Sequence, residues 1–212
     1  MQIIGIDPKS ADAPLRAVRA LAAGGIVAFP TDTYYALGAS AWNAEAIARV
    51  FAAKRRPAGE PLPVLVADRA QWSAVAAELP DAALRLAERF WPGALTIVCR
   101  RAAHLPAALT GGGETVGVRQ PNSAAALALC RAAGAPHTGT SANTHGRPAP
   151  LTAVEVALDL GSAVDLILDG GPCPGGQPST VVDVTEAPPR IVRAGAVSAD
   201  AVRQALERAA AV

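Results

Sequence analysis

The chain has 212 residues, of which 51% are apolar and only 4% aromatic, and its formal net charge at pH 7 is +1. A chain of this length can bury a sizeable core. Proteins that are held by many phosphates usually carry a basic excess, so the charge balance argues against general polyanion binding and leaves room only for a local nucleic-acid contact.

The cysteines and the N-terminus indicate the compartment. Cys99, Cys130 and Cys173 form no close pair and have no histidine at ligand spacing. This pattern favours a reduced, intracellular protein without a structural zinc ion. The N-terminus lacks the basic and long apolar regions of a signal peptide, and no apolar run is long enough to span a bilayer. We therefore expect a cytoplasmic protein without membrane contact.

Short apolar runs alternate along the chain with segments of helical periodicity. In chain order, the expected strands cover residues 3–6, 26–29, 62–66, 95–99, 115–118, a short piece within 136–143, 166–168, 179–184 and 191–193. The first expected helix is capped by Asp12 and closed by Gly24–Gly25, and the second is capped by Asn43 and ends at 54–56. Two alanine-rich helices follow, around 72–79 and over 81–90, and then one from Ser123 to Ala133. The last two are a helix from a Thr152–Glu155 capping box to Leu160 and a helix capped by Ser198.

Strands and helices interleave without a strict βαβ repeat, and several strands near the end follow one another directly. This order favours an α/β protein with a mixed, twisted sheet flanked by helices. Because no internal repeat, low-complexity tract or linker divides the chain, we expect one domain over residues 1–212. The glycine- and proline-rich segment 170–178 is interpreted as a mobile loop rather than as a linker.

A polar loop follows the buried strand 26–29, which Pro30 stops because proline cannot donate to a β-ladder. Thr31, Asp32 and Thr33 come next and could cap the following element. However, a polar loop at the end of a buried strand is also where open α/β sheets bind ligands.

The basic run after the second expected helix has two explanations. Cations in a last helical turn complement the helix dipole. Lys54, however, lies seven residues after Ile47 on the apolar stripe of the helix, so its ammonium group must either snorkel or reach a buried anion. Arg55 points elsewhere and is expected to be solvated.

Familiar site motifs are missing from the sequence. Residues 139–143 look like a nucleophile elbow, but Asn143 stands where the pattern requires a glycine after Ser141, and histidines are few. This disfavours a serine hydrolase. The chain has no P-loop and no Rossmann fingerprint, so a nucleotide would have to bind by another arrangement. We expect no side-chain metal site.

Basic residues at element ends and small polar residues in loops could converge at one edge of the sheet. They would line a cleft that suits a polyanion with a small polar co-substrate. A cation about 4 Å from a phosphate gains about 1 kcal/mol in water and about 4 kcal/mol in a partly buried site, so Lys54 and Arg56 should matter more than Arg55 or Arg101. The full set is Lys54, Arg56, Arg119, Arg193, Thr31, Thr33, Ser141, Asn143 and Ser179.

An ordered set of short motifs between Gly24 and Gly195 resembles the YrdC-like family, the threonylcarbamoyl-AMP synthases, in a short form without an extra C-terminal domain. The motifs are the loop 29–38, Lys54–Pro57, Thr115–Arg119, Thr140–Asn143, Ser179–Asp183 and Arg193–Gly195. The resemblance implies the YrdC-like fold with a basic cleft. It also implies a nucleotidyltransferase that combines L-threonine, bicarbonate and ATP, with Mg²⁺, into threonylcarbamoyl-AMP and pyrophosphate. A downstream tRNA threonylcarbamoyl transferase protein would then pass the group to adenosine in tRNA.

The same resemblance implies a role for each matching residue. It assigns the triphosphate and the reacting phosphorus to Lys54, Arg56, Ser141 and Asn143, and the nucleotide side also to Thr115 and Arg193. It assigns threonine to Thr31, Thr33, Arg119 and Ser179, with Arg119 pairing with the substrate carboxylate as a planar fork can. The chain departs from the family pattern at Leu65 (usually histidine), Ala36 (glycine), Glu60 (asparagine), Thr140 (proline) and Pro178 (glutamate).

Two other functions stay open. An RNA-binding module would bind with a strength that falls steeply with salt and would not need threonine, although the near-neutral charge and few aromatics disfavour it. A paralogue with another amino-acid or carbamoyl substrate would turn over ATP without stimulation by threonine, and Leu65 points in that direction. If the enzyme interpretation holds, Lys54→Ala or Arg56→Ala should abolish pyrophosphate release and leave the fold intact.

Overall fold

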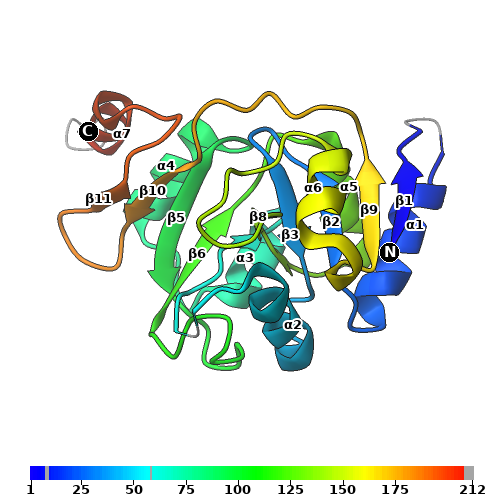
Figure 1. The fold of residues 1–212 in the computed structure, drawn as a ribbon. Helices are drawn as coiled ribbons and strands as arrows, with labels where there is room; N and C mark the ends of the chain where they lie inside the picture. Colours follow the sequence, from blue (N-terminus) through cyan, green and yellow to red (C-terminus); the bar gives the residue numbers. More distant parts are fainter. Residues whose placement is uncertain (8–9, 58, 208–212) are drawn as a thin grey trace.

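Two mixed β-sheets form the centre of the molecule in the computed structural model, which describes residues 1–7, 10–57 and 59–207 (Figure 1). The first sheet has the strand order β1-β9-β2-β3-β8, with β1 Gln2–Gly5, β2 Val27–Pro30, β3 Tyr35–Gly38, β8 Thr140–Ser141 and β9 Leu166–Asp169. The second has the order β11-β10-β5-β6-β4-β7, with β4 Val64–Leu65, β5 Leu95–Arg100, β6 Thr115–Arg119, β7 His137–Thr138, β10 Thr180–Asp183 and β11 Arg190–Arg193. The α/β class with mixed pairing is confirmed, but the expected sheet is divided into two.

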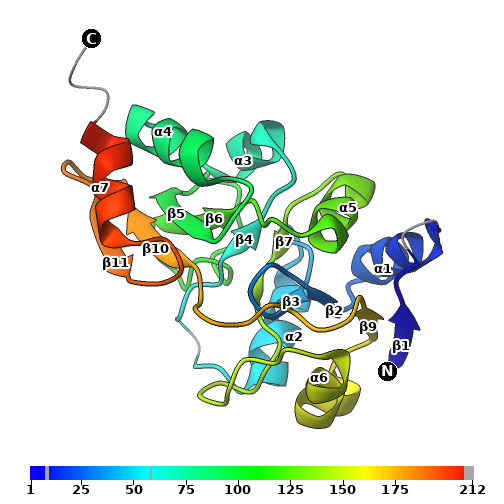
Figure 2. The ribbon, with the colours of Figure 1, turned by 90° about the horizontal axis from the view of Figure 1, so that it is seen from above.

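Helices cover both sides of the sheets. They are α1 Asp12–Ala22, α2 Ala44–Lys54, α3 Arg69–Val75, α4 Asp81–Phe90, α5 Ala124–Ala133, α6 Ala153–Leu160, a 3-10 turn Gly161–Ala163 and α7 Ala199–Glu207. Figure 2 shows α4, α3, α5 and α1 along one side of the sheets, with α2 and α6 on the other. No helix in the described ranges is long and apolar enough to cross a membrane.

Most expected helix caps are confirmed. Asn43 accepts a hydrogen bond from Ala46 N over 3.0 Å, Ser123 caps α5, and Thr152 forms a complete capping box with Glu155. The side chain of Ser198 accepts from Ala201 N over 3.2 Å. The prediction for Asp12 is wrong, because Asp12 is already helical and its own backbone N–H donates to Ser10 Oγ over 3.2 Å.

The polar loop forms the turn of a β-hairpin, because strand β3 follows it directly in antiparallel pairing with β2. The sequence did not predict β3. Thr31 organises the turn: its Oγ1 accepts from the backbone N–H groups of Thr33 and Tyr34 over 3.1 and 3.3 Å and donates to Tyr34 O over 2.7 Å. Thr31 and Thr33 are therefore held on a short, internally bonded turn between two buried strands.

A single residue, Gly139, separates β7 in the second sheet from β8 in the first. Its N–H donates to Pro63 O over 2.8 Å. A Cβ at this position would overlap the side chain of Leu65, so only glycine fits between the strand ends. The two sheets are thus joined at this point by one residue.

Residues 170–178, which we call the strap, carry the chain from β9 in the first sheet to β10 in the second, across the top of Figure 1. Tyr34 donates its hydroxyl to Gly176 O over 2.6 Å, and Tyr35 donates to Gly171 O over 2.8 Å. Gly175 N also donates to Thr33 O over 2.9 Å. The segment expected to be a mobile loop is therefore attached to the hairpin, and its motion stays a prediction.

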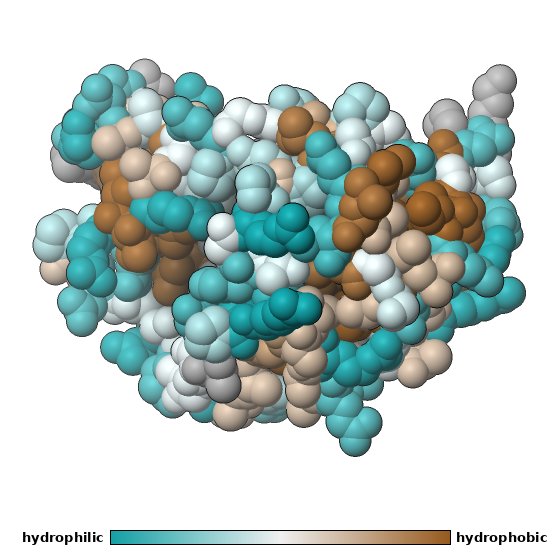
Figure 3. All heavy atoms as spheres, viewed as in Figure 1, coloured by the Kyte–Doolittle hydropathy of each residue, from teal (hydrophilic) through white to brown (hydrophobic). Residues whose placement is uncertain are grey.

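Hydrophilic residues occupy much of the middle of the face shown in Figure 3, with apolar patches towards both sides. One of the patches lies over α6, where Val154 and Leu158 are exposed. The buried apolar residues form two clusters. The larger includes Ile47 and Ile97, and the smaller includes Phe29 and Leu65.

Candidate active site

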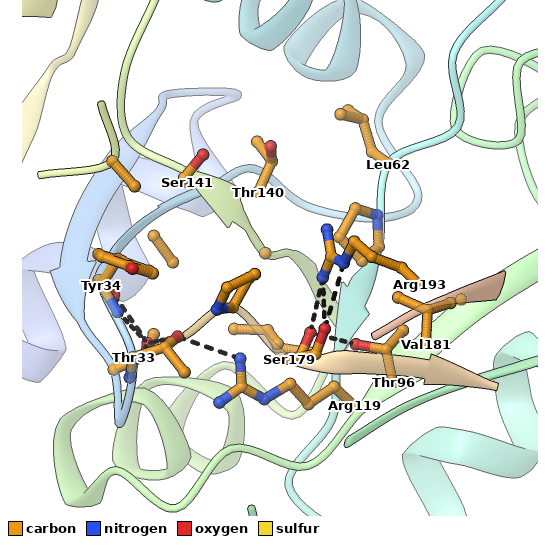
Figure 4. A pocket seen from close by; sticks show the side chains of 18 of the residues that line it. Thr33, Tyr34, Leu62, Thr96, Arg119, Thr140, Ser141, Ser179, Val181 and Arg193 are labelled. Carbon is orange, nitrogen blue, oxygen red and sulfur yellow. Dashed lines mark hydrogen bonds between the residues drawn. The ribbon is translucent and has the colours of Figure 1, made fainter. Parts of the chain in front are cut away.

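A cavity of about 370 Å³ is lined by residues of both sheets (Figure 4). It contains most of the residues that the sequence singles out. The candidates that line it are Thr31, Thr33, Arg56, Thr115, Arg119, Ser141, Ser179 and Arg193. The exceptions are Lys54 and Asn143, which are not among the lining residues. The expected convergence of loops and strand ends is therefore present for most of the set.

Arg119, at the end of β6, is fixed by the protein on each of its guanidinium nitrogens. Nε donates to Gly93 O over 2.9 Å, Nη1 to Thr33 Oγ1 over 3.3 Å, and Nη2 to Asp32 Oδ1 over 2.6 Å. Figure 4 shows the contact with Thr33 at the cavity wall. Asp32 is thus the largely buried counter-ion of Arg119. This role could not be predicted from the sequence, although Asp32 lies between two candidate threonines.

Arg193, in β11, is held by Ser179, which directly precedes β10. Its Nη2 donates to Ser179 O over 2.7 Å and to Ser179 Oγ over 3.1 Å, and that hydroxyl also contacts Thr96 Oγ1 at 2.9 Å (Figure 4). Burial lowers the pKa of Arg193, and the nearby charge of Arg119 lowers it further. The two cations therefore concentrate positive potential in the same cavity.

Arg56 enters the cavity just beyond α2, where the exposed Arg55 adopts a left-handed conformation with φ 50° and turns the chain. Its Nη2 donates to Pro61 O over 3.2 Å and lies 3.1 Å from Glu60 Oε2. Its Nε is buried without a hydrogen-bond partner in the described parts of the chain. Arg56 therefore keeps an unused donor, while Arg55 is solvated as expected.

Lys54 lies behind the cavity and is only 2% exposed. Its ammonium group donates to the carbonyl oxygens of Ser141 and Asn143, the latter over 2.7 Å, and approaches Asn143 Oδ1 at 3.4 Å. The prediction that it must snorkel or reach an anion is wrong, because neutral oxygens satisfy it. Burial lowers the pKa of Lys54 to about 8, with a further contribution from the charge of Arg56.

Asn143 is also used internally. Its Nδ2 donates to Thr144 O over 3.0 Å and to Arg147 O over 2.6 Å. Lys54 and Asn143 together fix the short segment that carries Ser141 to the cavity wall. In this arrangement they support the lining rather than belong to it.

Several lining residues were not among the candidates. Leu62, Thr96 and Val98 lie outside the sequence motifs, whereas Tyr34, Tyr35, Gly117 and Val181 lie within motifs but were given no role. For Thr96 a signal exists, because it alternates with the buried Leu95 and Ile97 of β5 and so faces the same side as Val98. Four of the family departures also line the cavity, namely Ala36, Leu65, Thr140 and Pro178. Glu60 does not.

The lining is cationic and neutral, with no carboxylate among the described residues that form it. Within the described ranges, no group of three or more histidine, cysteine, aspartate and glutamate side chains could hold a metal ion. The arrangement therefore suits an anion, next to hydroxyl groups that can accept or donate hydrogen bonds.

Comparisons with known proteins identify the family of the chain. A family profile described as "Telomere recombination", which groups Sua5, YciO and YrdC proteins, matches residues 19–195. The threonylcarbamoyl-AMP synthase of Pyrococcus abyssi is 42% identical over 183 residues, which cover 86% of this chain and 54% of that protein. The Bacillus subtilis threonylcarbamoyl-AMP synthase is 41% identical over 179 residues, covering 84% and 51%. The chain thus spans about half the length of these two relatives.

A shorter relative and two solved structures extend the comparison. A putative threonylcarbamoyl-AMP synthase of Mycobacterium tuberculosis is 38% identical over 190 residues and is covered to 87% of its length. The crystal structure of P. abyssi Sua5 complexed with L-threonine has a TM-score of 0.94 at 38% identity, covering 98% of this chain and 61% of that one. Escherichia coli YciO has a TM-score of 0.84 at 29% identity, with 94% and 97% covered. The chain therefore belongs to the Sua5, YciO and YrdC family.

Proposed function

We propose that the chain is a threonylcarbamoyl-AMP synthase, which forms threonylcarbamoyl-AMP and pyrophosphate from L-threonine, bicarbonate and ATP. The observation that carries the proposal is the cavity, which gathers Arg56, Arg119 and Arg193 with serine and threonine hydroxyls in about 370 Å³. The names of the P. abyssi and B. subtilis relatives support it, as does the threonine bound in the solved P. abyssi protein.

The reaction needs no nucleophile from the protein. The threonine amine adds to the carbon of bicarbonate, and loss of water gives a carbamate. A carbamate oxygen then attacks the α-phosphorus of ATP, the bond from this phosphorus to the oxygen bridging to the β-phosphorus breaks, and pyrophosphate leaves. Confinement of the unstable carbamate next to the phosphorus supplies much of the acceleration. Fixed arginines stabilise the charge on the phosphoryl oxygens and on the leaving group.

The threonine side of the site would use Thr31, Thr33, Arg119 and Ser179. A guanidinium group has five N–H donors. Those of Arg119 make three hydrogen bonds to described residues, so two remain for a substrate carboxylate.

On the nucleotide side, Arg56, Ser141, Thr115 and Arg193 would contact ATP from the lining. Lys54 and Asn143 would act from behind by fixing Ser141. Mg²⁺ would arrive with ATP and be held by phosphate oxygens, because the described lining offers it no carboxylate.

The product of this reaction needs a second protein that accepts the threonylcarbamoyl group. That protein would transfer the threonylcarbamoyl group to tRNA, with at most a local tRNA contact by this chain, and a cytoplasmic location would suit that partner. We also retain the expectation that residues 1–212 form one domain, supported by the junction at Gly139, which places strands of both sheets in one short stretch.

Pyrophosphate release by the purified protein tests the proposal. ATP, magnesium and bicarbonate are supplied with threonine, serine, glycine or no amino acid, and the product mass is recorded. We expect release that requires threonine and bicarbonate, with the mass of threonylcarbamoyl-AMP. Arg119→Ala should lose the pyrophosphate release that threonine stimulates. Arg203→Ala, a change at an exposed helix position, should keep it.

Two outcomes would contradict the proposal. Release that is equal with every amino acid would assign the fold to a paralogue with another substrate and focus attention on Leu65. Absence of release together with tRNA binding that weakens steeply with salt would favour an RNA-binding module.

A further inference from the structure

The arginines of the cavity differ in how their charge is balanced. Arg119 is paired with Asp32, and the two side chains are only 9% and 15% exposed. Arg193 is held by the carbonyl and hydroxyl of Ser179, and no described carboxylate lies within ion-pair distance of it. Arg56 is intermediate, because its partner Glu60 is 41% exposed. Glu60 is thus the carboxylate beside the cavity that can most easily release its arginine.

The position of Glu60 follows from the backbone. The segment after Arg56 is held by the hydrogen bond from Leu62 N to Leu109 O over 2.9 Å. Gly59 packs so closely on Gly111 that a Cβ at Gly111 would overlap its carbonyl oxygen. Glu60, four residues after Arg56 in the sequence, lies between these two attachment points, Gly59 and Leu62.

Glu60 also lies close to a guanidinium group and an imidazole ring. Its Oε2 lies 3.1 Å from Arg56 Nη2 and 3.9 Å from His145 Nδ1. The backbone N–H of His145 in turn donates to Lys54 O over 2.6 Å, and the charge of Arg56 lowers the pKa of the buried Lys54 ammonium group. An anion beside Arg56 is favourable, and in the structure the anion is Glu60.

A bound triphosphate would compete for the same guanidinium group. Arg56 lines the cavity, and its Nε is a buried donor without a partner in the described residues. Phosphate oxygens could take up this donor, but Nη2 is shared with Glu60, whose negative charge would also repel the triphosphate. An ion pair that is partly exposed stabilises weakly, so little free energy is needed for Arg56 to exchange Glu60 for a phosphate group.

We infer that Glu60 is a positioning residue that sets nucleotide affinity through Arg56: it holds the arginine in the free protein and must yield it to the triphosphate. This inference rests on the proposed function for the identity of the anion. It predicts that removal of the Glu60 charge strengthens nucleotide binding, an effect that a merely structural role would not produce.

Calorimetric titration of the full chain with MgATP, without threonine and bicarbonate, tests the inference independently of turnover. Glu60→Gln should lower the Kd for MgATP by about threefold to tenfold at low ionic strength, with a smaller gain at high salt. Glu114→Gln is the matched control, because Glu114 is also an exposed partner of a less exposed arginine, Arg101, and lies outside the cavity lining. It should leave the Kd unchanged.

The same titration in the Arg56→Ala variant shows whether Glu60 acts on the Kd for MgATP through Arg56. Glu60→Gln should give its gain in the native background and a clearly smaller gain when combined with Arg56→Ala, because only the direct repulsion of the triphosphate is then relieved. In turnover assays the KM for ATP should fall, while the KM for threonine stays the same. An unchanged or raised Kd in Glu60→Gln overturns the inference, and so does a full gain in the Arg56→Ala background. Tighter MgATP binding without threonine-dependent release would uphold the inference and refute the proposed function.

Discussion

The guanidinium group of Arg119 donates from Nη2 to Oδ1 of Asp32 over 2.6 Å, and this pair lies on the hairpin side of the cavity with side-chain exposures of 9% and 15%. Removal of one member of such a pair leaves the other charge buried and unpaired. The pair therefore fixes the arginine that we assign to threonine, but it also makes the fold depend on Asp32.

Asp32→Ala should lower the free energy of unfolding by about 3 kcal/mol, because the charge of Arg119 loses its buried partner. Urea denaturation followed by circular dichroism measures the change. Asp200→Ala is the control, because Asp200 pairs with Arg203 at exposures of 77% and 60% and should lose less than about 0.5 kcal/mol. Similar small losses in both variants would show that the buried pair contributes nothing net.

Lys54 and Arg56 should respond differently to substitution, contrary to the expectation from sequence that both changes leave the fold intact. Lys54→Met removes a buried ammonium group and leaves the carbonyl oxygens of Ser141 and Asn143 without their donor. We expect a loss of about 2 to 4 kcal/mol in unfolding free energy together with weaker pyrophosphate release.

Arg56→Ala should abolish pyrophosphate release. It should lower the free energy of unfolding by less than about 1 kcal/mol, because the ion pair of Arg56 is partly exposed. Denaturation and release assays on both variants provide the comparison. Equal stability losses in Lys54→Met and Arg56→Ala would argue against the supporting role of Lys54.

His137 should make the stability depend on pH. It is 1% exposed, its Nδ1 has no partner among the described residues, and burial lowers its pKa from 6.5 to about 4. Between these values the unfolded chain binds the proton and the folded chain does not. His137 therefore stabilises the fold fully only above about pH 6.5, and this contribution is lost as the pH falls towards 4.

Unfolding free energies of the native chain and of His137→Leu, measured from pH 7 to pH 5, test this linkage. The native chain should lose about 2 kcal/mol more than the variant over that range. His104→Gln, a change of an exposed imidazole, serves as the control. Parallel pH profiles for the native chain and His137→Leu would contradict the linkage.

Local signals in the sequence predicted the fold where the deciding interactions are local. Asn43, Ser123 and Thr152 cap their helices because a short oxygen-bearing side chain reaches the N–H group three residues on. At Asp12 the same rule failed because the helix already includes Asp12, whose N–H donates to the side chain of Ser10 before the helix. Strand β3 was missed because its residues 35–38 directly follow the polar turn, and no breaker separates the two.

Long-range partners could not be predicted in the same way. The division into two sheets depends on pairings such as Leu65 with Arg119 and with His137, which lie far apart in the sequence. The partners of Lys54 are backbone carbonyls, which every residue possesses, so no residue type marked them. Asp32 was visible as a polar residue, but its pairing with Arg119 required the hairpin and β6 to meet in space.

The junction at Gly139 limits how the cavity can change its width. Thr138 and Thr140 belong to different sheets but are two Cα steps apart, so the covalent chain keeps them within about 7 Å of each other. At the opposite crossing the strap spans nine residues, 170–178, and this length allows a much larger separation. The two sheets are therefore joined by a short connection at Gly139 and by a longer one at the strap. The covalent chain therefore constrains the separation of the sheets beside Leu65 more tightly than beside the strap.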